Sequence, residues 1–165
     1  NFESIDPAPP KTKENTIEDL ERELLDQELP LFRRYRAMFS LRDLASPPDR
    51  LTATPAVLSL AKGLSDTSAL FRHEIAFIFG QLSHPASIPS LTMTLRNLDE
   101  ASMVRHEAAE ALGTFGNKCG VFEVLKDFLT DKEQVVRDSV IVALDMAEFE
   151  SGGQTEYALI PEIPA

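Results

Sequence analysis

Two histidine-glutamate dipeptides, His73-Glu74 and His106-Glu107, are the residues of this sequence best suited to metal chemistry. The chain has three histidines, so two of the three directly precede a glutamate, and each dipeptide follows an arginine. Imidazole and carboxylate ligands without a thiolate favour iron or manganese over a structural zinc ion. Two histidines and one carboxylate form the three-ligand face of non-haem oxygenases. The pattern therefore predicts a non-haem iron site.

The spacing of the two dipeptides matters as much as their composition. Equivalent positions on stacked neighbouring helices face the same side, with helix axes about 8–10 Å apart. Imidazoles of His73 and His106 could therefore meet at one metal ion, about 2.1 Å from each nitrogen. Successive helical residues point about 100° apart, so we do not expect a histidine and its own following glutamate to bind the same ion in an undistorted helix.

A solvent-exposed helix face is the alternative interpretation of these dipeptides. A single His-Glu near a helix start is more often solvated, or places its carboxylate favourably in the first turn. Two copies in the same repeat register, with none elsewhere, favour the metal site. Glu110, one turn after His106, either joins an acidic patch or is a surface residue. Cys119 has no histidine at a recognisable spacing, which argues against nucleophilic catalysis.

The segments that carry the dipeptides are repeated along the chain. Four segments align without gaps, and each has two apolar residues followed by an arginine. These arginines are Arg33, Arg72, Arg105 and Arg137. In the outer segments, Arg34-Tyr35 and Asp138-Ser139 stand in place of His-Glu, so the repeat itself does not impose that pair. We expect the arginines to bond carbonyls or carboxylates between repeats rather than a substrate.

A second amphipathic stretch precedes each segment, and prolines or glycines separate the stretches. These first stretches cover residues 17–29, 56–64, 88–98 and 121–129. Four two-helix units with a period of about 33 residues predict an all-α fold, an α-solenoid of four HEAT-like helical hairpins that share one core. An unrelated helical bundle is the alternative. We assign residues 1–16 to a linker or arm, 17–149 to the four repeats and 150–165 to a tail.

The composition limits the classes of partner. A net charge of −11 argues against nucleic acid and against anionic membrane surfaces, and suits a cationic partner. No apolar run approaches the roughly 20 residues that a membrane span requires. The single cysteine favours a reducing, cytoplasmic location. Because the sequence begins at Asn1 rather than Met, we expect it to be part of a longer protein.

The phased Arg-His-Glu triplets and their repeats resemble the deoxyhypusine hydroxylases, a family of HEAT-repeat di-iron monooxygenases. The resembling segments are residues 31–43, 68–83, 103–114 and 135–147, preceded by residues 4–10. Members of that family have two similar halves of four repeats, and this chain resembles the C-terminal half. The resemblance implies O2-dependent hydroxylation of the deoxyhypusine side chain of a translation initiation factor, with two Fe(II) ions held between the halves.

The resemblance also implies roles for individual residues. His73, His106 and Glu107 match iron ligands, and Glu74 matches a catalytic glutamate that holds the incoming substrate amine. Because half of the ligand set is missing, we expect this chain to be inactive alone and to need the N-terminal half. An exposed metal face also favours self-association. The rival hypothesis is a non-catalytic HEAT scaffold that binds protein, which explains the repeats but not the phased dipeptides.

Overall fold

The computed structural model describes residues 15–152, so most of the predicted linker and tail lies outside the described residues. Within this range all regular structure is helical, which confirms the all-α prediction. The α-helices are α1 (Ile17–Leu25), α2 (Leu31–Leu44), α3 (Ala53–Lys62), α4 (Ala69–Leu82), α5 (Ile88–Arg96), α6 (Ser102–Gly113), α7 (Val121–Lys126) and α8 (Gln134–Gly152). Three short 3-10 helices accompany them: η1 (Gly63–Ser65), η2 (Pro85–Ser87) and η3 (Lys118–Gly120).

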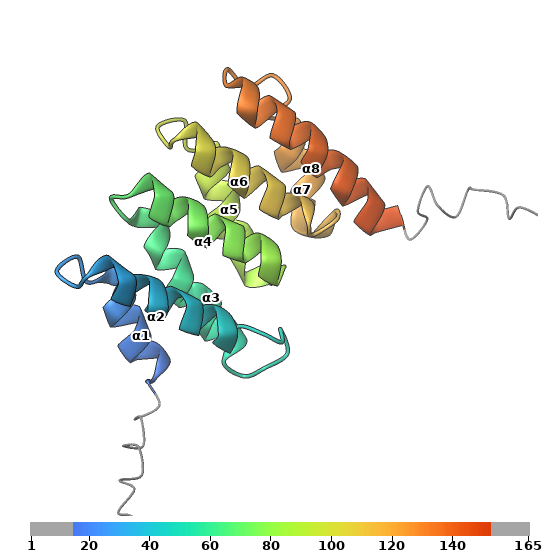
Figure 1. Cartoon of the computed structure of the whole chain (residues 1–165). Coiled ribbons are helices and arrows are strands. Elements are labelled where there is room, and N and C mark those ends of the chain that lie inside the picture. The colour runs from blue at the N-terminus through green and yellow to red at the C-terminus, as the bar shows by residue number, and fades with distance from the viewer. Residues whose placement is uncertain (1–14, 153–165) are drawn as a thin grey trace, which may run out of the picture.

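The helices pair into four successive hairpins. Figure 1 shows the second helices of the hairpins, α2, α4, α6 and α8, following one another in chain order in one layer, with the first helices behind them. Within that layer α4 packs against α6, and α6 packs against α8. This arrangement is the predicted α-solenoid of four hairpins. None of the helices in residues 15–152 is both long and apolar enough to cross a membrane.

Local signals determine where the helices begin and end. Thr16 caps α1 by accepting a hydrogen bond from the Asp19 backbone N–H, and the Asp19 side chain accepts one from the Thr16 N–H. Ser68 caps α4 in the same way, by accepting from the Phe71 N–H. The repeat body thus includes Thr16 as its first cap. At the other end, α8 continues to Gly152, three residues into the stretch that we assigned to the tail.

One continuous apolar core joins the hairpins. Its members come from both layers of helices, and each hairpin contributes fully buried side chains, such as Leu24, Phe79, Leu112 and Leu125. Burying one such side chain stabilises a fold by about 1.5–3 kcal/mol. A single hairpin could bury only one face of its apolar residues, so the stability of each repeat depends on its neighbours.

A small-residue contact sets the spacing of α6 and α8. A Cβ atom added to Gly113 would lie 2.8 Å from the Ala143 Cα and 2.9 Å from the Ala143 carbonyl oxygen. The backbone of α8 therefore approaches α6 more closely than any side chain at position 113 would allow. The corresponding contact between α4 and α6 is less tight, since a Cβ on Gly80 would lie 3.4 Å from Ala111.

Three arginines near the starts of α2, α4 and α6 bind acidic residues of the following repeat. Each acid lies in the loop that precedes the second helix of that repeat. The pairs are Arg34 with Asp66, Arg72 with Glu100, and Arg105 with Asp131. We call these three arginines the arginine row. The row confirms the predicted bonds between repeats for Arg72 and Arg105. Arg137 instead donates to the Asp131 and Lys132 carbonyls of its own repeat.

The arginine row corrects the alignment of the first repeat. Arg34 Nε donates to the Leu24 carbonyl over 3.0 Å, as Arg105 Nε donates to the Leu95 carbonyl over 3.0 Å, in both cases ten residues earlier. Arg33 pairs with Glu23 at the surface instead. The gapless alignment is therefore wrong by one residue here, because two successive arginines follow the apolar residues. Tyr35, not Arg34, occupies the position of the histidines.

Candidate metal centre

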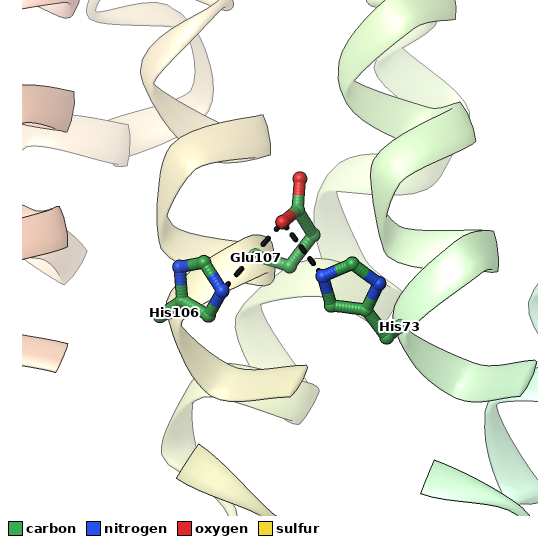
Figure 2. Close-up of side chains that lie close together, drawn as sticks. All are labelled: His73, His106 and Glu107. Atoms are coloured by element: carbon green, nitrogen blue, oxygen red, sulfur yellow. Dashed lines mark ion pairs between the residues drawn. The ribbon is translucent and has the colours of Figure 1, made fainter. Parts of the chain in front are cut away.

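His73 on α4 and the adjacent pair His106 and Glu107 on α6 turn toward one point between the two helices, as Figure 2 shows. The Glu107 Oε2 atom lies 3.0 Å from His73 Nε2 and 3.7 Å from His106 Nε2. The imidazole centroids are 5.9 Å apart. All three ligand atoms lie within 4.8 Å of one another. We call these three residues the histidine cluster.

The arginine row holds the two helices in the register that this cluster needs. Arg72 and Arg105 directly precede the two histidines, and each is fixed by an acid of the next repeat. Because α4 and α6 pack side by side in the same orientation, the residues after the arginines face the same side. The repeated positions of His73 and His106 therefore bring the two dipeptides to one place between α4 and α6.

The structure differs from one geometric expectation. We do not expect a histidine and its following glutamate to bind the same ion in an undistorted helix, yet His106 and Glu107 both face this cluster, and α6 is a regular helix there. The cluster lies in the gap between helices, where the long Glu107 side chain can lean toward α4 beside the imidazole. His73 and Glu74 follow the expectation, since Glu74 Oε1 lies 4.0 Å from Nδ1, the ring nitrogen outside the cluster.

Glu107 is a largely buried carboxylate without a lysine or arginine partner among the described residues. Its side chain is 12% exposed, and its ion pairs are with the two imidazoles alone. Burial raises the pKa of the Glu107 carboxyl, and the nearby charge of Glu110 raises it further, whereas His73 and His106 act in the opposite direction. A bound cation would supply the charge that this carboxylate lacks.

The spacing of the Glu107 carboxylate from each imidazole is compatible with a divalent metal ion. Bonds of about 2.1 Å place neighbouring ligands about 3 Å apart and opposite ligands about 4 Å apart. The contacts of 3.0 and 3.7 Å within the cluster fall in this range. Two imidazoles and one carboxylate leave open positions for other ligands. The imidazole side chains are 21% and 23% exposed, so small molecules can reach those positions.

Glu74 lies next to the cluster but not in it. Its side chain is 33% exposed, and on α4 it is near the phenol of Tyr35 on α2. Burial raises the pKa of the Tyr35 hydroxyl, and the negative charge of Glu74 raises it further. Within residues 15–152 no arginine or lysine forms an ion pair with Glu74, and His73 Nδ1 is 4.0 Å from its Oε1 atom.

The outer side of the His106 ring meets residues that sequence reasoning did not assign to the site. His106 Nδ1 lies 3.2 Å from the Ser139 hydroxyl of α8 and 3.5 Å from Glu110 Oε1. The sequence contains one indication for Ser139, because it occupies the same repeat position as Glu107 does in the preceding repeat. The third histidine, His84, accepts a hydrogen bond from the Ala86 N–H and caps η2, outside the cluster.

Comparison with known proteins gives consistent matches. A family profile described as HEAT repeats matches residues 54–145. The chain is 71% identical to the deoxyhypusine hydroxylase of Neurospora crassa over 166 residues, which cover 99% of this chain and 51% of that protein. The deoxyhypusine hydroxylase of Gibberella zeae is 70% identical over 165 residues, which cover 98% of this chain and 49% of that protein.

A solved structure of human deoxyhypusine hydroxylase in complex with glycerol is also similar, with a TM-score of 0.73 and 46% identity. The match covers 88% of this chain and 48% of the human chain. These similarities confirm the resemblance to deoxyhypusine hydroxylases, and the chain spans about half the length of the relatives that it matches. With its four stacked hairpins and the matching profile, the chain belongs to the HEAT-repeat family.

Proposed function

We propose that this chain is the C-terminal half of a deoxyhypusine hydroxylase and supplies half of its iron ligands. The reaction is O2-dependent hydroxylation of the deoxyhypusine side chain of a translation initiation factor. The observation that carries this proposal is the convergence of His73, His106 and Glu107 in a chain that is similar to half of known deoxyhypusine hydroxylases. A plain protein-binding scaffold has no need for such a cluster.

His73, His106 and Glu107 would hold one Fe(II) ion, and an equivalent set from the N-terminal half would hold a second. Hydroxylation of an unactivated C–H bond needs electrons for oxygen, which bound iron would supply and side-chain acids and bases do not. The protein orients the ligands through the packing of α4 against α6. The largely buried Glu107 carboxylate has no lysine or arginine partner among the described residues, which favours its use as a metal ligand.

Glu74 would bind the amine of the incoming substrate. A deoxyhypusine side chain is long and cationic, and a carboxylate without a cationic partner, close to His73, matches that charge. The net charge of −11 adds a general attraction for a basic ligand. In this arrangement Glu74 holds the substrate on the α2 side of the site, while the histidine cluster faces the reacting carbon.

One set of three ligands holds one iron, so the chain alone would be inactive. The partner that completes the site is the N-terminal half. A second copy of this chain is the alternative partner for the same exposed face, in a two-fold arrangement that imitates the two halves.

Iron binding tests the site directly. Purified chain is loaded with Fe(II) under anaerobic conditions, and bound iron is quantified for the wild type, His73→Ala, His106→Ala and His84→Ala. We expect one Fe(II) per chain in the wild type, loss of that iron in the two cluster variants, and retention in His84→Ala, because His84 lies outside the cluster. Iron-free wild type, or cluster variants that bind normally, would favour the scaffold hypothesis.

A single-turnover assay tests the division of the active site. The chain is mixed with substrate factor, alone or with its N-terminal half, and hydroxylated product is measured by mass spectrometry. Product should form only in the mixture, and Glu74→Gln should raise the substrate concentration needed for half-maximal rate. Authentic product from the chain alone would contradict the proposed inactivity.

A further inference from the structure

His106 has a support on its outer side that His73 lacks. Its Nδ1 atom lies 3.2 Å from the Ser139 hydroxyl and 3.5 Å from Glu110 Oε1, and these two oxygens are 3.5 Å apart. Ser139 is 5% exposed and comes from α8, the second helix of the last hairpin. Nδ1 of His73 is buried without a hydrogen-bond partner among the described residues. The two imidazoles are therefore held differently.

The donors and acceptors around His106 favour one direction for the protons. An ionised carboxylate only accepts hydrogen bonds, so the Ser139 hydroxyl donates to Glu110. Its oxygen is then placed to accept from an N–H at Nδ1 of His106, and a negative charge on Glu110 favours a proton at that same nitrogen. In a neutral imidazole with its proton on Nδ1, the lone pair lies on Nε2, the atom that faces Glu107.

We propose that Ser139 and Glu110 are positioning residues that hold His106 in the Nδ1–H tautomer and present Nε2 as a ready metal ligand. The inference deepens the proposed iron site and rests on it. Partners of this kind, on the far side of a ligating histidine, fix the ring orientation and raise ligand basicity. It gives the last hairpin a role in the site, although that hairpin contributes no ligand to the cluster.

Repeat symmetry explains why Ser139 reaches His106. Glu107 of α6 contacts His73 of α4, and Ser139, at the same repeat position on α8, contacts His106 of α6. The same contact between neighbouring repeats therefore occurs twice. In the first, the Glu107 carboxylate faces the metal position; in the second, the Ser139 hydroxyl lies on the side of His106 that faces away from it. A hydroxyl suits the second place because it accepts from Nδ1 and donates to Glu110 at once.

The tautomer can be measured without metal. Nitrogen-15 NMR of the histidine rings distinguishes Nδ1–H from Nε2–H in metal-free protein at about pH 8, where an ordinary imidazole is neutral. We expect His106 to carry its proton on Nδ1 in the wild type and in Ser139→Thr, which retains the hydroxyl. Ser139→Ala should shift the population toward Nε2–H. Ser59→Ala is the matched control, because Ser59 is also a buried helical serine that donates to a glutamate, Glu21, over 2.6 Å.

Fe(II) affinity, measured anaerobically, gives the second readout. Ser139→Ala and Glu110→Gln should weaken binding by about 10- to 100-fold, the usual cost of losing such partners, while Ser139→Thr and Ser59→Ala stay near the wild type. A proton on Nε2 in the wild type, or an unchanged tautomer and affinity in Ser139→Ala, would overturn the inference. Wild type that binds no Fe(II) but keeps the Nδ1–H tautomer would instead refute the iron site alone.

Discussion

The arginine row and the histidine cluster lie next to each other in sequence and behave oppositely. Arg105 is 1% exposed in its side chain, and its guanidinium is matched by Asp131, itself 3% exposed. His106, the following residue, keeps 23% of its side chain exposed and faces Glu107, which has no lysine or arginine partner in the described part of the chain. The same pairing of arginine before histidine recurs at Arg72 and His73.

The difference shows how one helix turn can serve two purposes. A buried charge is tolerated in a fold when it has a partner, as in the arginine row, and removing one partner of such a pair is strongly destabilising. A buried carboxylate without a cationic side chain costs stability, and it is retained where a ligand supplies the missing charge. The arginine row therefore fixes the register of the repeats, and the histidine cluster uses that register for binding.

Breaking the arginine row should have the largest effect on stability. Arg105→Ala leaves Asp131 buried without its partner and removes the bond to the Leu95 carbonyl, so we expect a loss of about 3–5 kcal/mol in the free energy of unfolding. Urea denaturation followed by circular dichroism measures it. Arg33→Ala is the control, because Arg33 is 44% exposed and pairs at the surface, where we expect a change of at most about 1 kcal/mol. Equal losses in both variants would contradict the distinction.

Gly113→Ala should have the next largest effect. The added Cβ would meet the backbone of Ala143 at 2.8 Å, and such overpacking costs about 1–3 kcal/mol. Moving α8 away from α6 should also disturb the contact between Ser139 and His106. Gly80→Ala is the matched variant, since its Cβ has room and alanine favours a helix by about 1 kcal/mol over glycine. In thermal unfolding experiments, we expect Gly113→Ala to have a lower Tm than the wild type and Gly80→Ala not to.

Acid should weaken the ion pair between Arg105 and Asp131 in the arginine row. Hydrogen bonds from Arg105 lower the pKa of the Asp131 carboxyl from its ordinary value of 3.8. A group with a lowered folded-state pKa contributes stability fully above the ordinary value, and this contribution disappears as pH falls through the folded-state pKa. The unfolding free energy should therefore fall on acidification below about pH 4. Asp131→Asn should make this slope shallower, and an unchanged slope would contradict the assignment.

Neutralising the histidine cluster should have the smallest effect on stability, and one of opposite sign. Burial raises the pKa of the Glu107 carboxyl above its ordinary value of 4.5. The folded state therefore loses stability as pH rises from that ordinary value, and the loss is complete above the raised pKa. Glu107→Gln should therefore make metal-free protein at neutral pH slightly more stable, by less than about 1 kcal/mol, while abolishing Fe(II) binding. Urea denaturation and iron quantitation on the same preparations check both. A clear loss of stability would show that Glu107 is a structural residue.

Local patterns in the sequence were sufficient for the fold and for part of the site. Apolar spacing, breakers and the repeat period of about 33 residues predict four hairpins, because helix formation and amphipathicity are read within a few turns. The shared register of His73 and His106 predicts that their imidazoles converge, and the structure brings them together. The family resemblance implied that Glu107 is a metal ligand and that Glu74 binds the substrate amine. Both roles remain proposals.

Only the tertiary structure decided which neighbours meet across helices. It placed Arg34 rather than Arg33 in the buried row. It also brought the Glu107 carboxylate close to the ring of the preceding residue, His106, and placed the Ser139 hydroxyl on the opposite side of that ring. These contacts depend on how closely α4, α6 and α8 approach, as at Gly113 and Ala143. The sequence alone determined the helices and the repeated positions, because these follow from short-range spacing. The distances between helices arise from the packing of residues about 30 positions apart, which no local pattern encodes.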